Sequence, residues 1–132
     1  TDAVDEMVRV IKQIMADLGQ MKPNVVHEMQ KYHRDVWERI NDFQQSYILN
    51  MVRENIEWGR RDGLYRLDFD LETVARFYIA GAMSIFDERY FPKPPYTFDV
   101  LFKEFIVNYL HSVVSEKGMS ILKEKLRLDT NF

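Results

Sequence analysis

The feature that most constrains the fold is a helical stripe of apolar side chains between residues 34 and 61. An α-helix has about 3.6 residues per turn, so side chains three or four positions apart lie on one face. Apolar residues recur at this spacing, while the opposite face is charged. We therefore expect one helix long enough to cross a whole domain. The stripe consists of Val36, Trp37, Ile40, Phe43, Tyr47, Ile48, Met51, Val52, Asn55, Ile56 and Gly59.

The same spacing predicts helices on both sides of this segment. Gly19 and Gly118 are expected to end the helices that precede them, because glycine is favoured just beyond a helix C-terminus. The fold class is therefore all-α, an antiparallel multi-helix bundle of about five or six helices in a single domain over residues 1–132. The expected helices are Asp2 to Leu18, Pro23 to about His33, Arg34 to Arg61, Leu71 to about Tyr90, Thr97 to about Ser115 and Met119 to Leu126.

A charged, glycine-containing segment separates the long helix from the next one. Gly63 stands where the apolar stripe ends and can adopt the left-handed conformation of a helix C-terminal cap. Residues 64–69 alternate between apolar and polar side chains, and we interpret them as an extended connector pinned by its apolar members. Asp68 and Asp70 offer side-chain oxygens that can cap the helix beginning near Leu71.

Composition excludes several classes of protein. The formal net charge is −3, whereas a domain that neutralises several DNA phosphates carries a basic surplus, so we do not expect this chain to bind DNA directly. The chain has no cysteine, which excludes disulfides and thiolate chemistry and fits a reducing cytoplasm. No apolar run is long enough for a transmembrane helix, and no signal-peptide pattern opens the chain. We expect a cytoplasmic protein without membrane contact.

No arrangement of residues indicates catalysis. His27, His33 and His111 lie on different predicted helices, and none belongs to a repeated histidine and carboxylate motif of the kind that binds metal in helical bundles. No glycine-rich phosphate loop follows a strand, because no strand is predicted. We therefore expect no enzyme activity, no metal and no cofactor.

Two of the predicted helices, over residues 71–90 and 97–115, are apolar on more than one side. A helix that is apolar on every side must be covered on every side. Either other helices of the same chain cover these faces, or a second copy does, and we favour a two-fold homodimer with a four-helix interface. The residues assigned to this interface are Phe77, Gly81, Ser84, Val100, Val107, His111 and Val114.

Aromatic and methionine side chains recur on the predicted inner faces. They either fill gaps in an ordinary helical core or line a cavity for a small molecule. His33 or Asn55 could orient such a molecule through a hydrogen bond, and either could equally be a satisfied structural group. The candidate ligand-binding residues are Met15, His33, Trp37, Tyr47, Met51 and Tyr78.

The order of elements resembles the C-terminal ligand-binding and dimerisation domain of TetR-family transcriptional regulators. The features that carry the resemblance are the long helix ending in Gly59 and Gly63, the connector with its alternating residues, the nearly all-apolar helix, the proline-rich loop at 91–95 and the final long helix. The segment from Pro23 to Glu38 fits the same layout. The resemblance covers essentially the whole chain and rests on a pattern of elements.

The resemblance implies a bacterial one-component regulator whose helix-turn-helix domain would precede Asp2. It places a pocket between the first helix, the long helix and the core face of the Leu71 to Tyr90 helix. The expected effector is a small, uncharged, hydrophobic or aromatic molecule, and DNA would be contacted only through the missing N-terminal domain. The alternative is a free-standing helical interaction module or small-molecule carrier with no role at DNA.

Overall fold

The long apolar stripe forms a single helix, α3 (Arg34–Arg61), as predicted. In the computed structural model, which describes residues 1–18 and 22–128, the described residues form six helices and no strand, confirming an all-α multi-helix bundle. The other helices are α1 (Ala3–Leu18), α2 (Pro23–Tyr32), α4 (Leu71–Ser84), α5 (Phe98–Val113) and α6 (Glu116–Leu128). Gly19, the predicted cap of the first helix, lies outside the described residues.

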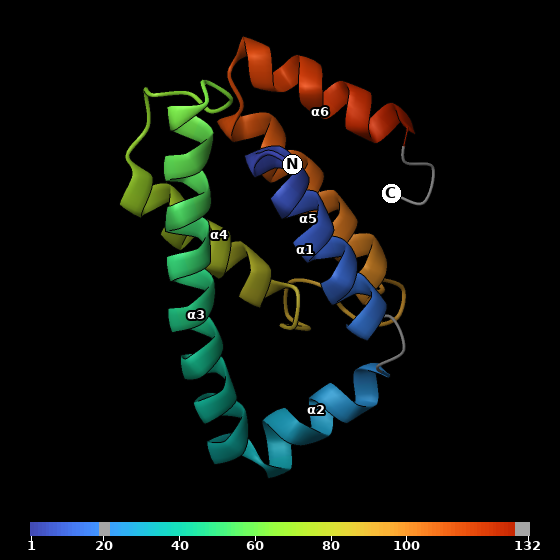
Figure 1. The fold of residues 1–132 in the computed structure, drawn as a ribbon. Coiled ribbons are helices and arrows are strands. Elements are labelled where there is room, and N and C mark those ends of the chain that lie inside the picture. The colour runs from blue at the N-terminus through green and yellow to red at the C-terminus, as the bar shows by residue number, and fades with distance from the viewer. Residues whose placement is uncertain (19–21, 129–132) are drawn as a thin grey trace.

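The helices surround α3 unevenly. Figure 1 shows α3 along one side of the molecule, α1 and α5 side by side along the other, α4 crossing behind and α6 across one end. α1 packs against α3, α5 and α6, and α4 packs against α3 and α5. Within the described residues, the backbone of α2 approaches only one other helix, α3. One end of α3 therefore has many neighbours and the other has few.

The core lies where α1, α5, α6 and the C-terminal half of α3 meet. Apolar side chains from all four helices are almost fully buried there, and this burial supplies most of the driving force for folding. These residues are Val4, Met7, Ile11, Val52, Ile56, Ile106, Leu110, Val113 and Leu122.

The connector after α3 is pinned to the core at its start, as predicted, but residues 67–69 form bends and Leu67 is 77% exposed. Gly63 adopts a positive φ of 73°, and the Leu64 amide donates back to the Gly59 carbonyl at 2.7 Å. Leu64 and Tyr65 are buried, and Tyr65 forms an isolated antiparallel bridge with Val114. This contact ties the end of α3 to the end of α5.

Polar side chains fix where α4 begins. The Asp70 carboxylate accepts the Thr73 amide at 3.0 Å, which confirms Asp70 as the N-cap. Asp68, the second predicted cap, instead pairs with Arg66 at 2.8 Å. α4 ends at Ser84, earlier than the predicted Tyr90, because the chain continues in turns held by the Lys93 ammonium on the Ile85 carbonyl at 2.6 Å.

Gly118 does not end a helix as predicted, because it lies inside α6. The break comes earlier, at Val114, whose backbone is extended, and the Ser115 hydroxyl then accepts the Gly118 amide at 3.1 Å. A methyl group at Gly118 would overlap the Leu64 carbonyl oxygen. Glycine is therefore required here for the close approach of α6 to the connector.

Among the helices of the described residues, none combines the length and the apolar character that crossing a bilayer requires.

Candidate functional site

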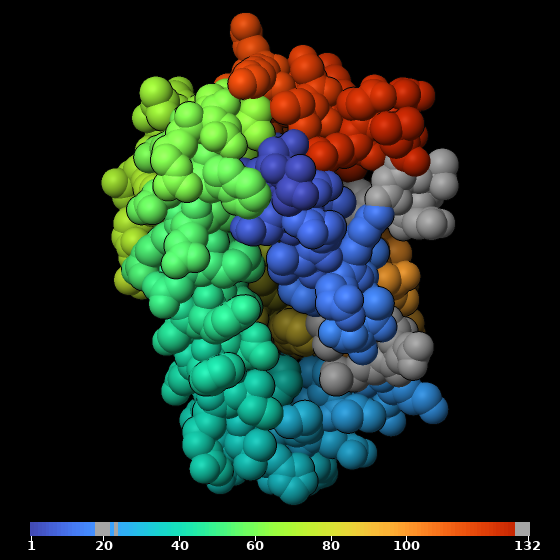
Figure 2. Space-filling view, viewed as in Figure 1, coloured from blue at the N-terminus to red at the C-terminus, as the bar shows by residue number. Residues whose placement is uncertain are grey.

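A cavity of about 370 Å³ lies among the helices at the end of the molecule where α2 joins α3. Side chains from α1, α2, α3, α4 and α5 line it, together with Phe86 from the turn after α4. Figure 2 shows the surface hollowed between α3 and α1, with atoms of the α4 region at the floor. The lining residues are Ile14, Asp17, Val26, Met29, Trp37, Ile40, Asn41, Gln44, Ile48, Met51, Tyr78, Ala82, Met83, Phe86 and Phe102.

The α3 wall of the cavity follows directly from helical geometry. Trp37, Asn41, Gln44, Ile48 and Met51 are separated by three or four positions, so they lie along one face of the helix. The Trp37 ring meets the Phe86 ring edge to face, with centroids 5.9 Å apart, and Phe86 in turn contacts Phe102 at 6.0 Å. These aromatic contacts join the α3 wall to the α4 turn and to α5.

The Tyr78 side chain lines the cavity on the side of α4 and packs against a second buried tyrosine behind it. The Tyr78 ring, from α4, packs against Phe105 and Tyr109 of α5, with centroids 5.0 and 4.8 Å away. Burial raises the pKa of both Tyr78 and Tyr109 above the ordinary range, so both hydroxyls stay protonated at physiological pH. The Tyr109 hydroxyl has no hydrogen-bond partner among the described residues.

A fully paired polar cluster lies nearby. Asn55, which is 1% exposed, donates to the Ala3 carbonyl and to the Glu6 carboxylate, both at 2.9 Å. The Asn55 carbonyl accepts the Tyr65 hydroxyl at 2.6 Å. Burial raises the pKa of Tyr65 as well. This cluster holds α1, α3 and the connector together and leaves Asn55 no free group for a ligand.

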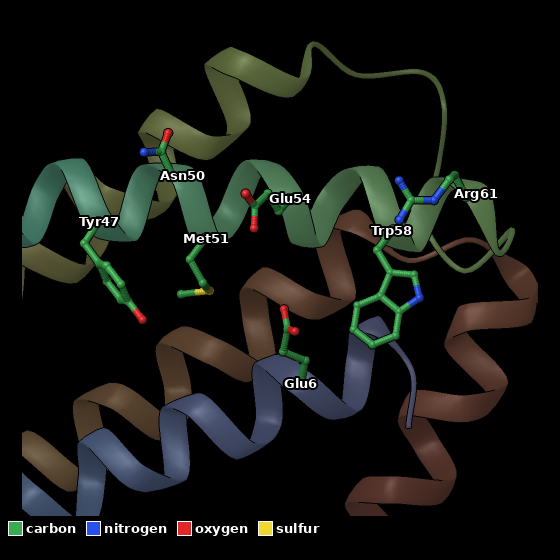
Figure 3. A pocket seen from close by; sticks show the side chains of 7 residues that line it. All are labelled: Glu6, Tyr47, Asn50, Met51, Glu54, Trp58 and Arg61. Carbon is green, nitrogen blue, oxygen red and sulfur yellow. The ribbon is translucent and has the colours of Figure 1, made fainter.

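A second depression, of about 480 Å³, lies between α1 and the C-terminal half of α3. Figure 3 shows Tyr47, Met51 and Trp58 directed from α3 toward α1, with Glu6 directed back from α1. Among the described residues, α3 supplies every residue that lines this depression except Glu6, and Tyr47 is 67% exposed. A molecule bound there would remain in contact with solvent. We therefore take the cavity, whose walls come from five helices and are mostly apolar, as the candidate site.

Comparison of the chain with protein-family models, with curated proteins and with solved structures found no match. Within residues 1–18 and 22–128, no group of three or more histidine and acidic side chains is placed so that it could hold a metal ion.

The predicted ligand-binding residues separate into two groups in the structure. Trp37, Met51 and Tyr78 line the cavity together. Tyr47 faces the surface depression instead, and Met15 is half-buried against the core without lining the cavity. His33 is exposed at the break between α2 and α3, where its amide bonds to the Met29 carbonyl. The first three residues remain candidates, and the other three lie away from the cavity.

Sequence reasoning missed several cavity residues. Val26 and Met29 lie three positions apart on α2, so helical spacing places both on one face, but the spacing does not indicate that this face borders a cavity. Phe86 follows the end of α4 in a turn, and no periodicity indicates its direction. Phe102 belongs to the inner stripe of α5, and its neighbour Leu101 is equally buried. Only the packing of α5 decides which of these two reaches the cavity.

The residues assigned to a dimer interface also divide. Phe77 and Val100 are 71% and 53% exposed, His111 is exposed, and Val107 is half-buried. Gly81 is approached by the Phe105 ring, and the Ser84 hydroxyl donates to the Gly81 carbonyl at 2.6 Å. Val114, predicted for the same surface, is instead 4% exposed because it pairs with the connector at Tyr65. It offers no surface to a partner.

Proposed function

We propose that this chain is the effector-binding and dimerisation domain of a TetR-like one-component transcriptional regulator. In this proposal a small hydrophobic or aromatic effector enters the cavity, and its binding alters the DNA affinity of a helix-turn-helix domain outside these residues. The single observation that carries the proposal is the mostly apolar cavity of about 370 Å³ walled by five helices. The order of the helices around it supports the resemblance drawn from the sequence.

Binding in the cavity can act on the helices because the cavity lies between two groups of helices. α2 and the first half of α3 form one wall, and α1, α4 and α5 form the others. A ligand that contacts all of them favours the helix arrangement in which these contacts fit best. The expected consequence is a change in the position of α1, the helix nearest the N-terminal end of the chain. A domain attached before α1 would move with it.

Tryptophan emission tests the ligand-binding part of this proposal. Trp37 lines the cavity, whereas Trp58 lines the surface depression. With Trp58→Phe as background, titration with para-tert-butylphenol, excited where this probe absorbs little, is expected to change Trp37 emission saturably. The matched variant Trp37→Phe, which retains Trp58, is expected to respond weakly.

A cavity-filling substitution provides the control for that titration. Ala82 is 5% exposed and lines the cavity, so Ala82→Leu is expected to occupy part of the space and weaken binding. Ala80→Leu, on the exposed side of the same helix, is expected to bind as the unmodified chain does. Saturable binding that Ala82→Leu leaves unchanged would place the ligand elsewhere. Absence of any saturable response would remove the ligand-binding proposal.

The dimerisation part rests on exposed apolar side chains of α4 and α5. Phe77→Asp is expected to shift the chain from dimer to monomer in sedimentation velocity, because an uncompensated charge at the centre of an interface costs about 3–5 kcal/mol. Phe43→Asp is the matched control, since Phe43 is 73% exposed, like Phe77, but lies on α3. A monomeric unmodified chain at micromolar concentration would contradict the dimer.

The residues encoded before Thr1 test the role at DNA. A helix-turn-helix pattern there supports a regulator, and an unrelated preceding domain would leave a ligand carrier as the function of the same cavity.

A further inference from the structure

Asn41 of α3 lies at the boundary between the cavity and a second space beside it. This second space, which we call the vestibule, has a volume of about 310 Å³. Among the described residues, the two spaces share four lining side chains, which therefore stand between them: Trp37, Asn41, Met83 and Phe86. Asn41 is the one carboxamide in this set. It lines the cavity itself, so a molecule in the cavity can contact it.

The two spaces differ in polarity. Apart from the shared side chains, the described residues that line the vestibule are all polar: Gln30, Asp87, Glu88 and Arg89. Glu88 and Arg89 are exposed, so the vestibule borders solvent. The cavity is lined mostly by aliphatic and aromatic side chains. A guest with an apolar body and one polar group would find a matching environment for both parts, with its polar group at this boundary.

The Asn41 carboxamide is available to such a guest. It forms no hydrogen bond with another group in the described part of the chain. The other asparagines of α3 differ, because the Asn50 carbonyl accepts from Arg53 at 3.0 Å and Asn55 is fully paired. Asn41 is half-buried, and its side chain offers an amide donor group and a carbonyl acceptor. A ligand can therefore bond to it without breaking a contact within the protein.

The charges around this boundary favour a neutral polar group. The Arg89 guanidinium donates to the Asp87 carboxylate at 2.7 Å, and the Glu88 carboxylate lies 3.8 Å from the His27 ring. A charged group of a ligand would compete with these pairs. The described lining of the cavity contains no lysine, arginine or histidine, and its one charged residue, Asp17, is exposed. Burying an ionised group without a partner is costly, and a neutral group meets no such penalty.

We propose that Asn41 recognises the polar group of the ligand, and that the ligand is an apolar molecule that carries one neutral carboxamide. A carboxamide presents an N–H donor and a carbonyl acceptor side by side, so it can form two hydrogen bonds with the Asn41 carboxamide, one in each direction. The apolar body lies in the cavity. The inference rests on the proposed ligand-binding function and deepens it by naming the chemical class of the ligand and a residue that selects it.

Three probes with one apolar body test this assignment: para-tert-butylbenzamide, para-tert-butylacetophenone and tert-butylbenzene. The benzamide offers a donor and an acceptor, the acetophenone carries a methyl group in place of the amide nitrogen, and the hydrocarbon offers neither. Equilibrium dialysis measures the affinity of each probe for the unmodified chain and for Asn41→Leu. Asn50→Leu is the matched control, because Asn50 belongs to the same helix but lines the surface depression. Circular dichroism confirms that the variants are folded.

Affinities are compared with that of the hydrocarbon, whose binding is expected to change little. Asn41→Leu is expected to lower the relative affinity of the benzamide about tenfold and that of the acetophenone about threefold, because the amide loses two neutral hydrogen bonds and the ketone loses one. Asn50→Leu is expected to leave both ratios unchanged. Asn41→Asp, which keeps the size of the side chain and removes its donor, provides a second variant and is expected to weaken the acetophenone relative to the hydrocarbon.

Relative affinities unchanged in both Asn41 variants would overturn the role of Asn41 while leaving the proposed cavity function intact, because the hydrocarbon would still bind. Equal losses of the benzamide and the acetophenone in Asn41→Leu would overturn the carboxamide as the ligand class. A loss in Asn50→Leu as large as that in Asn41→Leu would place the probes in the surface depression and overturn the assignment. If none of the three probes binds, the assignment and the proposed ligand-binding function both fail.

Discussion

The two ends of α3 differ sharply although one apolar stripe runs through both. The closed end comprises the C-terminal half of α3, the connector, α6 and the start of α1, and there Val52 and Ile56 are fully buried. The open end comprises α2 and the N-terminal half of α3. At the open end Tyr32, Phe43 and Tyr47 are each about two-thirds exposed or more. The same kind of sequence therefore produces a packed core at one end and exposed apolar surface at the other.

Neighbouring elements account for this difference. At the closed end α1, α5 and α6 converge on α3, and the connector folds back over its last turn. At the open end the backbone of α2 approaches only α3 among the described helices, and the cavity lies between these two helices and α1, α4 and α5. Amphipathic periodicity thus reports that a helix face is apolar, and the tertiary arrangement decides what covers it.

Gly118→Ala is the largest expected disruption of the closed end. The added methyl group would overlap the Leu64 carbonyl oxygen, and a backbone atom held by its own hydrogen bond to Ser115 cannot yield cheaply. We expect a loss of about 3 kcal/mol in the free energy of unfolding, measured by urea denaturation.

Ser120→Ala, on the exposed side of α6, is the control for Gly118→Ala and is expected to change stability by less than about 0.5 kcal/mol. A Gly118→Ala variant as stable as this control would mean that the contact between α6 and the connector is loose, and that the two ends differ less than their burial indicates.

Two tyrosine substitutions compare the paired polar cluster of the closed end with the unpaired hydroxyl beside the cavity. Tyr65→Phe removes the donor to Asn55 and leaves a buried carbonyl oxygen one bond short, at an expected cost of about 2 kcal/mol in unfolding free energy. Tyr109→Phe removes a hydroxyl without a partner among the described residues, so stability is expected to stay the same or rise. Equal losses in thermal or urea unfolding would contradict the distinction.

Local sequence signals were sufficient where a structural feature is determined by residues that lie close together in the sequence. Helical spacing gave the bounds of α3, and the left-handed glycine at Gly63 and the cap at Asp70 follow from local backbone chemistry. Gly118 shows the limit of this reasoning. A glycine also suits a close contact inside a helix, and the partner of that contact, Leu64, is remote in sequence.

The cavity was predictable only in part for the same reason. Trp37, Met51 and Tyr78 were identified as candidates because they lie on inner helical faces, and all three line the cavity. Tyr47 and Ile48 are adjacent, so they point about 100° apart on α3, and only Ile48 reaches the cavity. The apolar stripe includes both residues, so it does not indicate which of them reaches the cavity. That choice depends on where α1 and α4 meet α3.

The smallest effect is expected from an ion pair that ties the C-terminal half of α3 to α4. Arg53 bonds to Glu72 at 2.6 Å, and this guanidinium lowers the Glu72 pKa from 4.5 to about 2. A carboxylate with a lowered pKa stabilises the fold above its unfolded pKa, near 4.5, and this contribution is lost as the pH falls toward about 2. The effect is modest because the Glu72 side chain is 43% exposed and screened by water and salt.

Glu72→Gln is therefore expected to be slightly less stable than the unmodified chain from neutral pH down to about 4.5, by a constant difference that disappears as the pH approaches about 2. Thermal midpoints measured across this range at low salt check the prediction. Glu57→Gln removes an exposed charge of α3 that pairs with no cation in the described part of the chain, and it serves as the control. If both variants follow the same pH profile, the pair contributes nothing specific, and α4 is held to the closed end by apolar packing alone.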